Sequence, residues 1–417
     1  FPTRRSSDLP APYNALSSCA LNPIYLSLHD LPYIQEPPRS TPLNLLSHVA
    51  YTDVQSFKMH ELRNYYEKLP STIFEEKEFT NFIHENSWLK PYALFKAIKD
   101  RLSQNHWMSW PDELSFKNYE QLCAKYAQEM QFYIFLQYLC FLQLTQVKKY
   151  AHEKNILLKG DIPILISPDS ADAWSRPEIF DFSLSAGAPP DQYNQEGQNW
   201  GFPLFNWEMV NQEHFSWWKQ RLTTASLYYD LYRIDHVLGF FRIWAIPLGK
   251  RATEGKFLPE NPELWIPQGK ALLEKMLQAS LMLPIAEDLG QVPPSVRTCL
   301  SELGICGTKV MRWERKYQHN QEFIPLNEYP PLSMTTVSTH DSETLSQWWK
   351  ERPEEAGVLA HQKQWTYSPD LTFEERLEIL KDAHHTTSLF HINLLQEYLA
   401  LFPELISSSL EDERINI

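Results

Sequence analysis

Three acidic residues stand at the ends of short apolar runs in the second half of the chain. Asp235 ends LYRID, Glu287 follows SLMLPIA, and Asp341 ends MTTVSTHD. A strand that is buried on both faces has room for a charge only at its ends. If these runs are parallel strands, the three carboxyl groups meet at the carboxyl edge of one sheet, where they could share a reaction.

Cleavage of a glycosidic bond is the chemistry that three such acids could perform. It needs at least two carboxyl groups, one ionised and one protonated, and a third can stabilise the positively charged transition state. Arg233 lies two residues before Asp235, so both side chains face the same way, and we expect the guanidinium to lower the pKa of Asp235 and keep it ionised. A structural ion pair at a strand end explains the same two residues equally well.

The second acid cannot be chosen from the residues alone, because strand alternation turns only one of Glu287 and Asp288 inward. A glutamic acid among apolar residues would keep its proton through desolvation and could act as a general acid. An Asp288 helix cap, with Glu287 near the helix dipole, is the structural alternative. Asp341 has a similar alternative, since it or Ser342 could cap the following helix.

Alternating strands and helices are the elements predicted to position these acids. From about residue 155, apolar runs such as ILLKGDIPILIS, LYRID, SLMLPIAED and TKVMRW are separated by helical stretches such as FSWWKQRLTTASLYY and PPSVRTCLSELG. This order is typical of a parallel sheet. An open doubly wound sheet would also bind ligands at its carboxyl edge, but no GxGxxG or GxxxxGK[ST] motif is present. We therefore predict an α/β fold of the (β/α)8 TIM-barrel type.

The rest of the chain divides into segments of different character. Residues 51–150 follow a helical pattern after the proline-rich stretch QEPPRSTPLNL, which predicts a helical insertion subdomain. It would lie between a barrel segment at 11–50 and the remainder of the catalytic barrel at 151–417. The glycine- and proline-rich stretch 183–206 is expected to form a long lid loop.

Composition disfavours several classes of partner and location. The 417 residues carry a net charge of −14, whereas nucleic acid or an anionic membrane requires a basic face. The longest apolar window, YIFLQYLCFLQL, is shorter than the roughly 20 residues that span a bilayer. Five scattered cysteines without a CxxC pair favour a reducing cytoplasm. Residues 1–10, FPTRRSSDLP, lack an initiator methionine and a signal-peptide apolar stretch, and we expect them to be a non-native leader.

Other catalytic classes lack their motifs. No HExxH or comparable ligand spacing occurs, so a metal site is not expected, and the absence of Gly-x-Ser-x-Gly disfavours a nucleophilic serine. Aromatic residues make up 13% of the chain, and their faces can stack on sugar rings, although most should lie in the core. Tyr193 and Trp200, within 183–206, are the best candidates for such stacking.

Several motifs follow one another in a set order: APYNALSSCALNPIYL, GDIPILISPDSADAW, AGAPPDQYNQEGQNWGFPLFNW, RIDH, IAEDLG and THD. Together they resemble the 4-α-glucanotransferases called amylomaltases or disproportionating enzymes, relatives of the α-amylases. The resemblance runs from about residue 11 to 417. RIDHVLGFFRIWAIP and THDSETLSQWW are most similar to the branch that includes plant cytosolic disproportionating enzymes.

The resemblance implies Asp235 as nucleophile, Glu287 as general acid/base and Asp341 as transition-state stabiliser. It thereby selects Glu287 over Asp288. It also implies a set of residues that bind substrate: Arg233, His340, His236, Asp169, Tyr13, Tyr193, Gln198 and Trp200. Members of this family transfer α-1,4-glucan segments between maltodextrins by a retaining double displacement through a covalent glycosyl-enzyme, which needs no metal and no cofactor. Maltooligosaccharides or glycogen-derived chains are the implied donor and acceptor.

The chain also departs from the family pattern. The segment that contains the family's first barrel strand is missing before Ala11, and a NWxxR-like stretch is missing after Ile417. We therefore expect an incomplete barrel, truncated at both ends, whose unpaired edge could leave this chain inactive. Gln192 stands where many relatives have an aromatic residue. An α-glucan hydrolase and an inactive glucan-binding fragment are the alternative functions.

Overall fold

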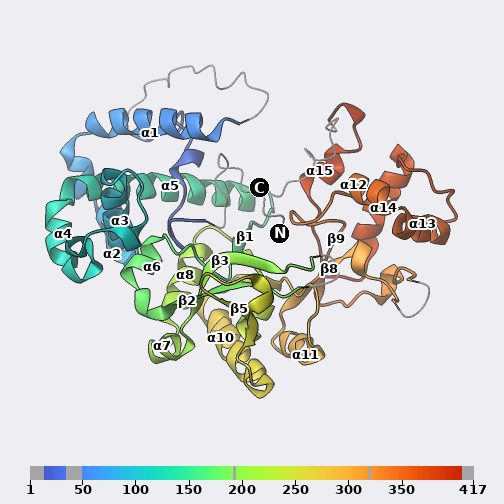
Figure 1. Ribbon diagram of the computed structural model, residues 1–417. Coiled ribbons are helices and arrows are strands. Elements are labelled where there is room, and N and C mark those ends of the chain that lie inside the picture. The colour runs from blue at the N-terminus through green and yellow to red at the C-terminus, as the bar shows by residue number, and fades with distance from the viewer. Residues whose placement is uncertain (1–13, 34–48, 191–193, 318–320, 406–417) are drawn as a thin grey trace.

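The computed structural model describes residues 14–33, 49–190, 194–317 and 321–405. Figure 1 shows helices α1 to α4 gathered at one end of the molecule and α12 to α14 at the other, with strands between them. The central part contains two sheets, one parallel and one antiparallel. The acids singled out above belong to the parallel sheet and the loops at its edge.

The parallel sheet has six strands in the order β1-β4-β7-β8-β9-β10. Their bounds are β1 Lys159–Ile162, β4 Leu231–Ile234, β7 Leu283–Ala286, β8 Cys306–Val310, β9 Ser333–Thr336 and β10 Phe390–His391. Their register places Arg233 of β4 opposite both Asp161 of β1 and Ile285 of β7. The predicted α/β fold with a parallel sheet is confirmed. Within the described residues β1 and β10 are the two ends of this sheet, so the closed (β/α)8 barrel remains a prediction.

Alternation along the strands separates two packing faces. Tyr232, Ile234 and Ala286 belong to a large core that packs under helices of the outer layer. Leu231 and Ile285, one residue out of step, face the opposite side, where they form a small cluster with Cys306 and Met334. Because residues two apart on a strand share a face, Arg233 and Glu287 continue this second face toward the carboxyl edge.

Helices of the outer layer alternate with the parallel strands. They are α8 Ser216–Ser226, α9 Leu238–Phe241, α10 Trp265–Ala279 and α11 Pro294–Glu302, preceded by α6 Ala171–Ser175 and α7 Trp207–Gln212. In α8 the apolar residues Trp218 and Leu222 are one turn apart and almost fully buried. This spacing turns one stripe of the helix onto the sheet.

The segment expected as a loop at 183–206 is instead mostly β-structure. β2 Phe180–Ala188 and β3 Gln198–Phe205 pair antiparallel, and β5 Ile243–Pro247 and β6 Lys256–Leu258 extend the sheet in the order β3-β2-β5-β6. Strands this close need glycine at Gly187, where a Cβ would come 2.0 Å from the Gln198 carbonyl oxygen. The glycines that suggested a loop thus include one that allows close strand packing.

Five helices pack around one core of their own: α1 Tyr51–Glu67, α2 Lys77–Glu85, α3 Leu89–Arg101, α4 Tyr119–Lys125 and α5 Ala127–Glu153. The middle of α5 is buried on all sides, from Phe132 to Cys140, which explains why its sequence is apolar without a clear period. Gln137 of α5 binds the backbone N–H and carbonyl of Leu21, both at 2.8 Å, and so ties the preceding segment to these helices.

The last helices form a third core beside β9 and β10. They are α12 Leu345–Glu351, α13 Pro353–Gln362, α14 Phe373–His385 and α15 Leu395–Leu399. Trp348 and Trp349 are buried in this core together with Ile379 and Leu380 of α14. Thr372 begins α14 with a reciprocal capping box to Glu375.

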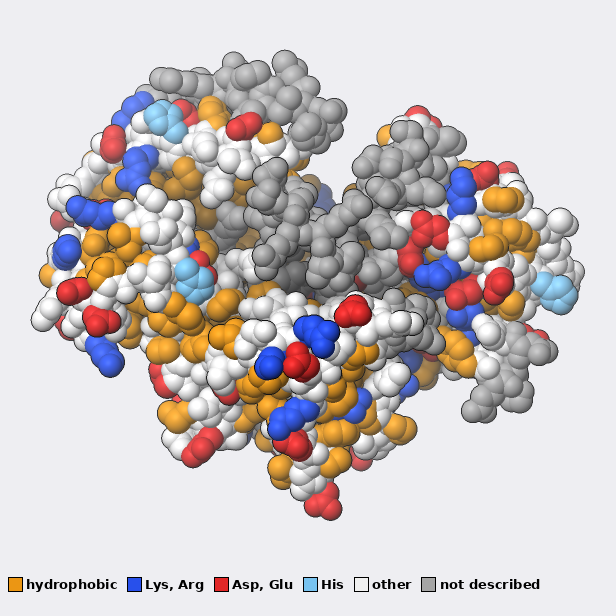
Figure 2. All heavy atoms as spheres, viewed as in Figure 1, with side chains coloured by type: hydrophobic (Ala, Val, Ile, Leu, Met, Phe, Trp, Pro, Cys, Tyr) orange, Lys and Arg blue, Asp and Glu red, His pale blue; other side chains and the backbone are white. Residues whose placement is uncertain are grey.

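Basic and acidic side chains are interspersed with apolar ones over the face drawn in Figure 2. Among the described residues, no helix combines the length and the hydropathy of a membrane span. The same residues contain no group of three or more His, Cys, Asp or Glu side chains arranged to hold a metal ion.

Candidate active site

A single arginine lies among the acids at the carboxyl edge of the parallel sheet. Arg233 Nη1 is 2.9 Å from Asp161 Oδ2, and its Nη2 is 2.7 Å from Asp235 Oδ1 and 2.6 Å from Glu287 Oε2. The three partners come from β1 and from the ends of β4 and β7, so the strand register brings them together. Only 13% of the Arg233 side chain is exposed, which strengthens these ion pairs compared with pairs in water.

Asp235 and Glu287 lie close enough to act on one bond. Because the same nitrogen of Arg233 binds both, their nearest oxygens are no farther apart than the sum of the two distances, 2.7 and 2.6 Å. So short a gap between the nearest oxygens is compatible with the close carboxyl pair of retaining glycosidases, whose carboxyl groups are about 5 to 5.5 Å apart. The His236 backbone N–H also donates to Glu287 Oε2, at 2.9 Å.

Glu287, rather than Asp288, faces Arg233. Asp288 turns to the neighbouring strand, where its Oδ1 accepts the Thr308 backbone N–H at 2.7 Å. Helix α11 begins only at Pro294, so Asp288 is not a helix cap and that alternative is wrong. Gly307 leaves the room that Asp288 needs, since a Cβ there would lie 2.8 Å from its Oδ1.

Asp341 lies in the loop between β9 and α12, beside His340. His340 Nε2 is 3.2 Å from Asp341 Oδ2, while Asp341 Oδ1 is buried and has no hydrogen-bond partner among the described residues. Burial and the charge of nearby Glu287 raise the pKa of Asp341. Thr344 caps α12 by accepting the Gln347 N–H, so the alternative of an Asp341 or Ser342 cap is also wrong.

The pKa values of Asp235 and Glu287 are shifted in directions opposite to those predicted from the sequence. Burial, followed by the neighbouring Glu287, raises the pKa of Asp235 well above its ordinary value. Burial would raise the pKa of Glu287 as well, but Arg233 and the His236 N–H outweigh burial and lower it. The prediction considered Arg233 as a partner of Asp235 alone, whereas the guanidinium serves both acids and Glu287 has one donor more. Of the two acids, Asp235 is therefore the one whose protonated form is favoured.

His236, Trp200 and Gln198 form a chain that joins β3 to the acidic cluster. The His236 backbone has a positive φ of 42°, and its ring meets the Trp200 ring edge to face with centroids 5.1 Å apart. Trp200 Nε1 donates to Gln198 Oε1 at 2.9 Å. Burial lowers the pKa of His236, so its imidazole is neutral near pH 7. Three residues assigned to substrate binding are thus brought together.

Asp169 has its contacts at the junction with the helical part of the molecule. Its Oδ2 is 2.5 Å from Nζ of buried Lys99 in α3, and its Oδ1 accepts the Trp107 N–H at 3.3 Å. A glucan contact of Asp169 therefore remains a prediction. The predicted site residues Tyr13 and Tyr193 lie outside the described residues, as does Gln192.

Two charged residues near the acids escaped the sequence analysis. Asp161 could have been found, because GDIP follows an apolar run in the same way as the other acids and the register sets it opposite Arg233. Arg221 could not have been found, because nothing in the sequence distinguishes it from other residues of a predicted helix. It is buried with its guanidinium 5.4 Å from the ring centroids of both Trp217 and Trp218, and it donates to the Pro163 carbonyl at 2.6 Å.

Comparison with known proteins identifies the family of the chain. A sequence model of the family described as 4-alpha-glucanotransferase matches residues 1–417. A 4-alpha-glucanotransferase of Chlamydia pneumoniae is 44% identical to the chain, over 100% of the chain and 80% of the relative. One from Synechocystis sp. is 33% identical, over 83% of the chain and 71% of the relative.

Solved structures share the fold. An amylomaltase from Streptococcus agalactiae, in complex with acarbose, superposes with a TM-score of 0.77 at 24% identity, over 94% of this chain and 80% of that one. An amylomaltase from Corynebacterium glutamicum gives a TM-score of 0.71 at 23% identity. The solved structures show the shared fold, while the family model and the Chlamydia pneumoniae relative, which both match the whole chain, show the family. The chain belongs to the 4-alpha-glucanotransferase family.

Proposed function

We propose that this protein transfers α-1,4-glucan segments between maltooligosaccharides by a retaining double displacement. The observation that carries the proposal is the binding of Asp235 and Glu287 by one nitrogen of Arg233. This arrangement supports a mechanism in which one carboxyl group attacks the anomeric carbon while the other protonates the departing oxygen, because it keeps the two groups close together.

In the first half-reaction Asp235 attacks the anomeric carbon and forms a covalent glycosyl-enzyme, while Glu287 gives its proton to the oxygen that leaves. In the second, Glu287 takes the proton of an acceptor hydroxyl, which attacks the same carbon and releases Asp235. The pair must hold one proton in total at the start. Asp235 lies within hydrogen-bonding reach of Glu287, so a proton that the pair shares can reside on Glu287 when the glucan binds.

Asp341 is proposed to stabilise the transition state. The sugar ring gains positive charge as the bond breaks, and a carboxylate oxygen with no partner in a buried position is attracted to that charge. His340, which is paired with Asp341, is proposed to bind the sugar beside it together with Arg233. Gln198, Trp200 and His236 would line the other side, with the Trp200 ring available for stacking.

The remaining predictions complete this picture. We infer that the six parallel strands are part of a (β/α)8 barrel, as their order and the parallel pairing of every neighbour allow. The helices within 51–150 would be an insertion into that barrel, and the hairpin of β2 and β3 would be the lid. Glycogen-derived chains as substrates and a cytoplasmic location follow from the same family resemblance.

Incubation with maltotriose separates transfer from its alternatives. Transfer yields glucose together with a ladder of oligosaccharides longer than maltotriose, resolved by chromatography. Shorter products alone would indicate a hydrolase, because water would have replaced the acceptor. Binding of maltotriose without any product would indicate a glucan-binding protein, and either result would overturn the proposal.

A further inference from the structure

The loop that carries His340 and Asp341 is anchored by two buried side chains of opposite charge from elsewhere in the chain. Arg312 lies in the 3-10 turn Met311–Trp313 that follows β8, and Glu397 lies in α15. Arg312 is 4% exposed and Glu397 is 1% exposed. Removing two charges from water costs free energy, so their contacts with the loop need an explanation.

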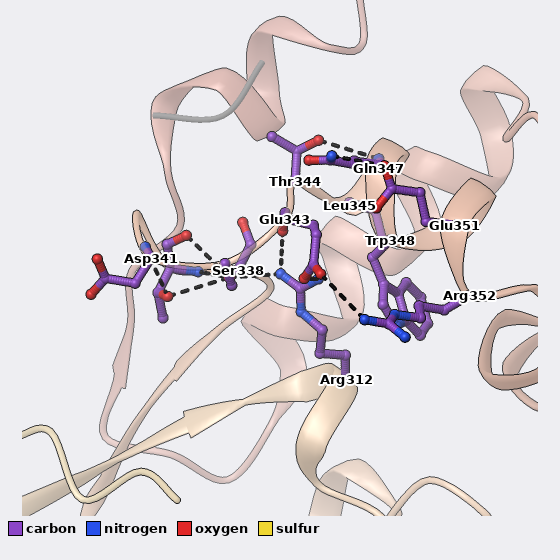
Figure 3. A network of polar contacts seen from close by, with 12 residues as sticks. Arg312, Ser338, Asp341, Glu343, Thr344, Leu345, Gln347, Trp348, Glu351 and Arg352 are labelled. Carbon is purple, nitrogen blue, oxygen red and sulfur yellow. Dashed lines mark hydrogen bonds and ion pairs between the residues drawn. The ribbon is translucent and has the colours of Figure 1, made fainter. Parts of the chain in front are cut away.

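Arg312 holds the residues that directly follow Asp341. Its Nη2 donates to Ser342 Oγ at 2.7 Å and to the Glu343 carbonyl oxygen, and its Nη1 is 3.2 Å from Glu343 Oε2. Ser342 Oγ in turn accepts the Thr339 N–H at 2.9 Å, which closes the backbone around residues 340 and 341. Figure 3 shows the Asp341 side chain pointing away from Arg312, so the guanidinium acts on the backbone rather than on the carboxylate.

Glu397 holds the two ends of the same segment. One of its oxygens, Oε1, accepts both the Ser338 hydroxyl and the Leu345 backbone N–H, the latter at 2.9 Å. A single acceptor therefore brings residues 338 and 345 together and closes the segment into a loop. His340 and Asp341 lie within this loop.

Asp341 depends on such anchoring because its own side chain is held weakly. Its ion pair is with His340, the adjacent residue in the same loop, and Oδ1 has no hydrogen-bond partner in the described part of the chain. Burial and, to a smaller extent, the neighbouring Glu287 raise the pKa of Asp341, so both disfavour its charged form. A carboxylate that must face other acids needs its backbone fixed, or it would turn toward water.

We propose that Arg312 and Glu397 are positioning residues, which fix the loop of residues 338–345 so that Asp341 faces the Asp235–Glu287 pair. They do this without touching the glucan. The inference rests on the proposed function, because it assigns a purpose to the position of Asp341 in glucan transfer.

The first test compares Arg312→Met with Arg315→Met. Arg315 is a matched control because it is 7% exposed in the same part of the fold, with its Nη2 3.2 Å from Glu355 Oε1 in α13. We expect both variants to lower the melting temperature, but only Arg312→Met to lower kcat, by about 10 to 100-fold, with KM changed less than about twofold. Arg312→Lys should recover part of kcat, since one ammonium can replace one of the donors.

A second test asks whether Arg312 acts through Asp341. In an Asp341→Asn background, Arg312→Met should lower kcat by no more than about twofold, because the carboxylate that the loop positions is already absent. Full additivity of the two substitutions would overturn the proposal. Glu397→Gln should lower kcat less than Glu397→Ala, since the amide oxygen keeps the acceptor position.

Hydrogen exchange provides a readout that does not depend on turnover. Amides of residues 338–345 should exchange faster in Arg312→Met than in the unsubstituted protein, and at an unchanged rate in Arg315→Met. Unchanged exchange in Arg312→Met would overturn the anchoring. Faster exchange with an unchanged kcat would show that the anchoring does not serve catalysis, and would overturn the proposal. If the unsubstituted protein itself transfers no glucan, the proposed function has failed instead.

Discussion

The acids of the candidate site are placed in two different ways. Asp161, Asp235 and Glu287 lie on or directly after adjacent parallel strands, and the register alone brings them to Arg233. Asp341 lies five residues beyond β9, in a loop whose position depends on side chains from β8's end and α15. Strand ends thus position the two acids proposed to react, whereas the acid proposed to stabilise charge lies in a loop that distant side chains contact.

The largest expected effect is the loss of activity when an acid at a strand end or the acid in the loop is replaced. Asp235→Asn removes the proposed nucleophile and should lower kcat by roughly 10⁴-fold or more. Asp341→Asn removes an electrostatic contribution and should cost about 10² to 10³-fold. Initial rates on maltotriose measure both, with Asp370→Asn as a control whose side chain is 84% exposed. Equal losses for Asp235 and Asp341 would contradict the division of roles.

The second prediction concerns pH and the strand-borne acids. The pair needs one proton, so kcat/KM should fall on the acid side when Glu287, whose pKa is lowered, takes up a second proton. It should fall on the alkaline side when Asp235, whose pKa is raised, loses the only one. Asp161 contributes to that raised pKa. Asp161→Asn should therefore move the alkaline limb to lower pH.

The pH profile of Asp161→Asn can be separated from a simple loss of folding. Since Asp235 has a raised pKa in the folded state, its contribution to stability is present at low pH and is lost as pH rises through that pKa. Asp161→Asn should reduce this loss, so the total fall in melting temperature between the ordinary aspartate pKa and the alkaline limb should be smaller than in the unsubstituted protein. An alkaline limb that stays in place would show that Asp161 has no influence on the pair.

The smallest expected effect tests how tightly strand register controls the site. Gly307→Ala places a Cβ against Asp288 and should lower the free energy of unfolding by about 1 to 3 kcal/mol. Gly357→Ala is the control, because nothing lies within 4 Å of a Cβ there and α13 should gain about 0.5 to 1 kcal/mol. Chemical denaturation measures both. A neutral Gly307→Ala would mean that Asp288 shifts freely.

Much of the site was predictable because its signals are local. Short apolar runs that end in an acid indicated buried strands with carboxylates at one edge, and this holds for Asp235 and Glu287. The motifs from APYNALSSCALNPIYL to THD were enough to indicate the family. The stretch 183–206 was interpreted wrongly because glycine and proline there permit close strand packing and a bulged hairpin, which have the same composition as a loop.

The sequence by itself determined which residue types end the strands, the parallel α/β class and the family, because these follow from periodicity and from motifs within a few residues of each other. Only the tertiary structure decided how Glu287 meets Arg233 while Asp288 turns to Thr308, that the pKa of Asp235 is raised while that of Glu287 is lowered, and that Arg312 and Glu397 contact the loop of Asp341. These outcomes depend on burial and on contacts between residues 20 to 59 positions apart in the chain, and such contacts leave no local pattern.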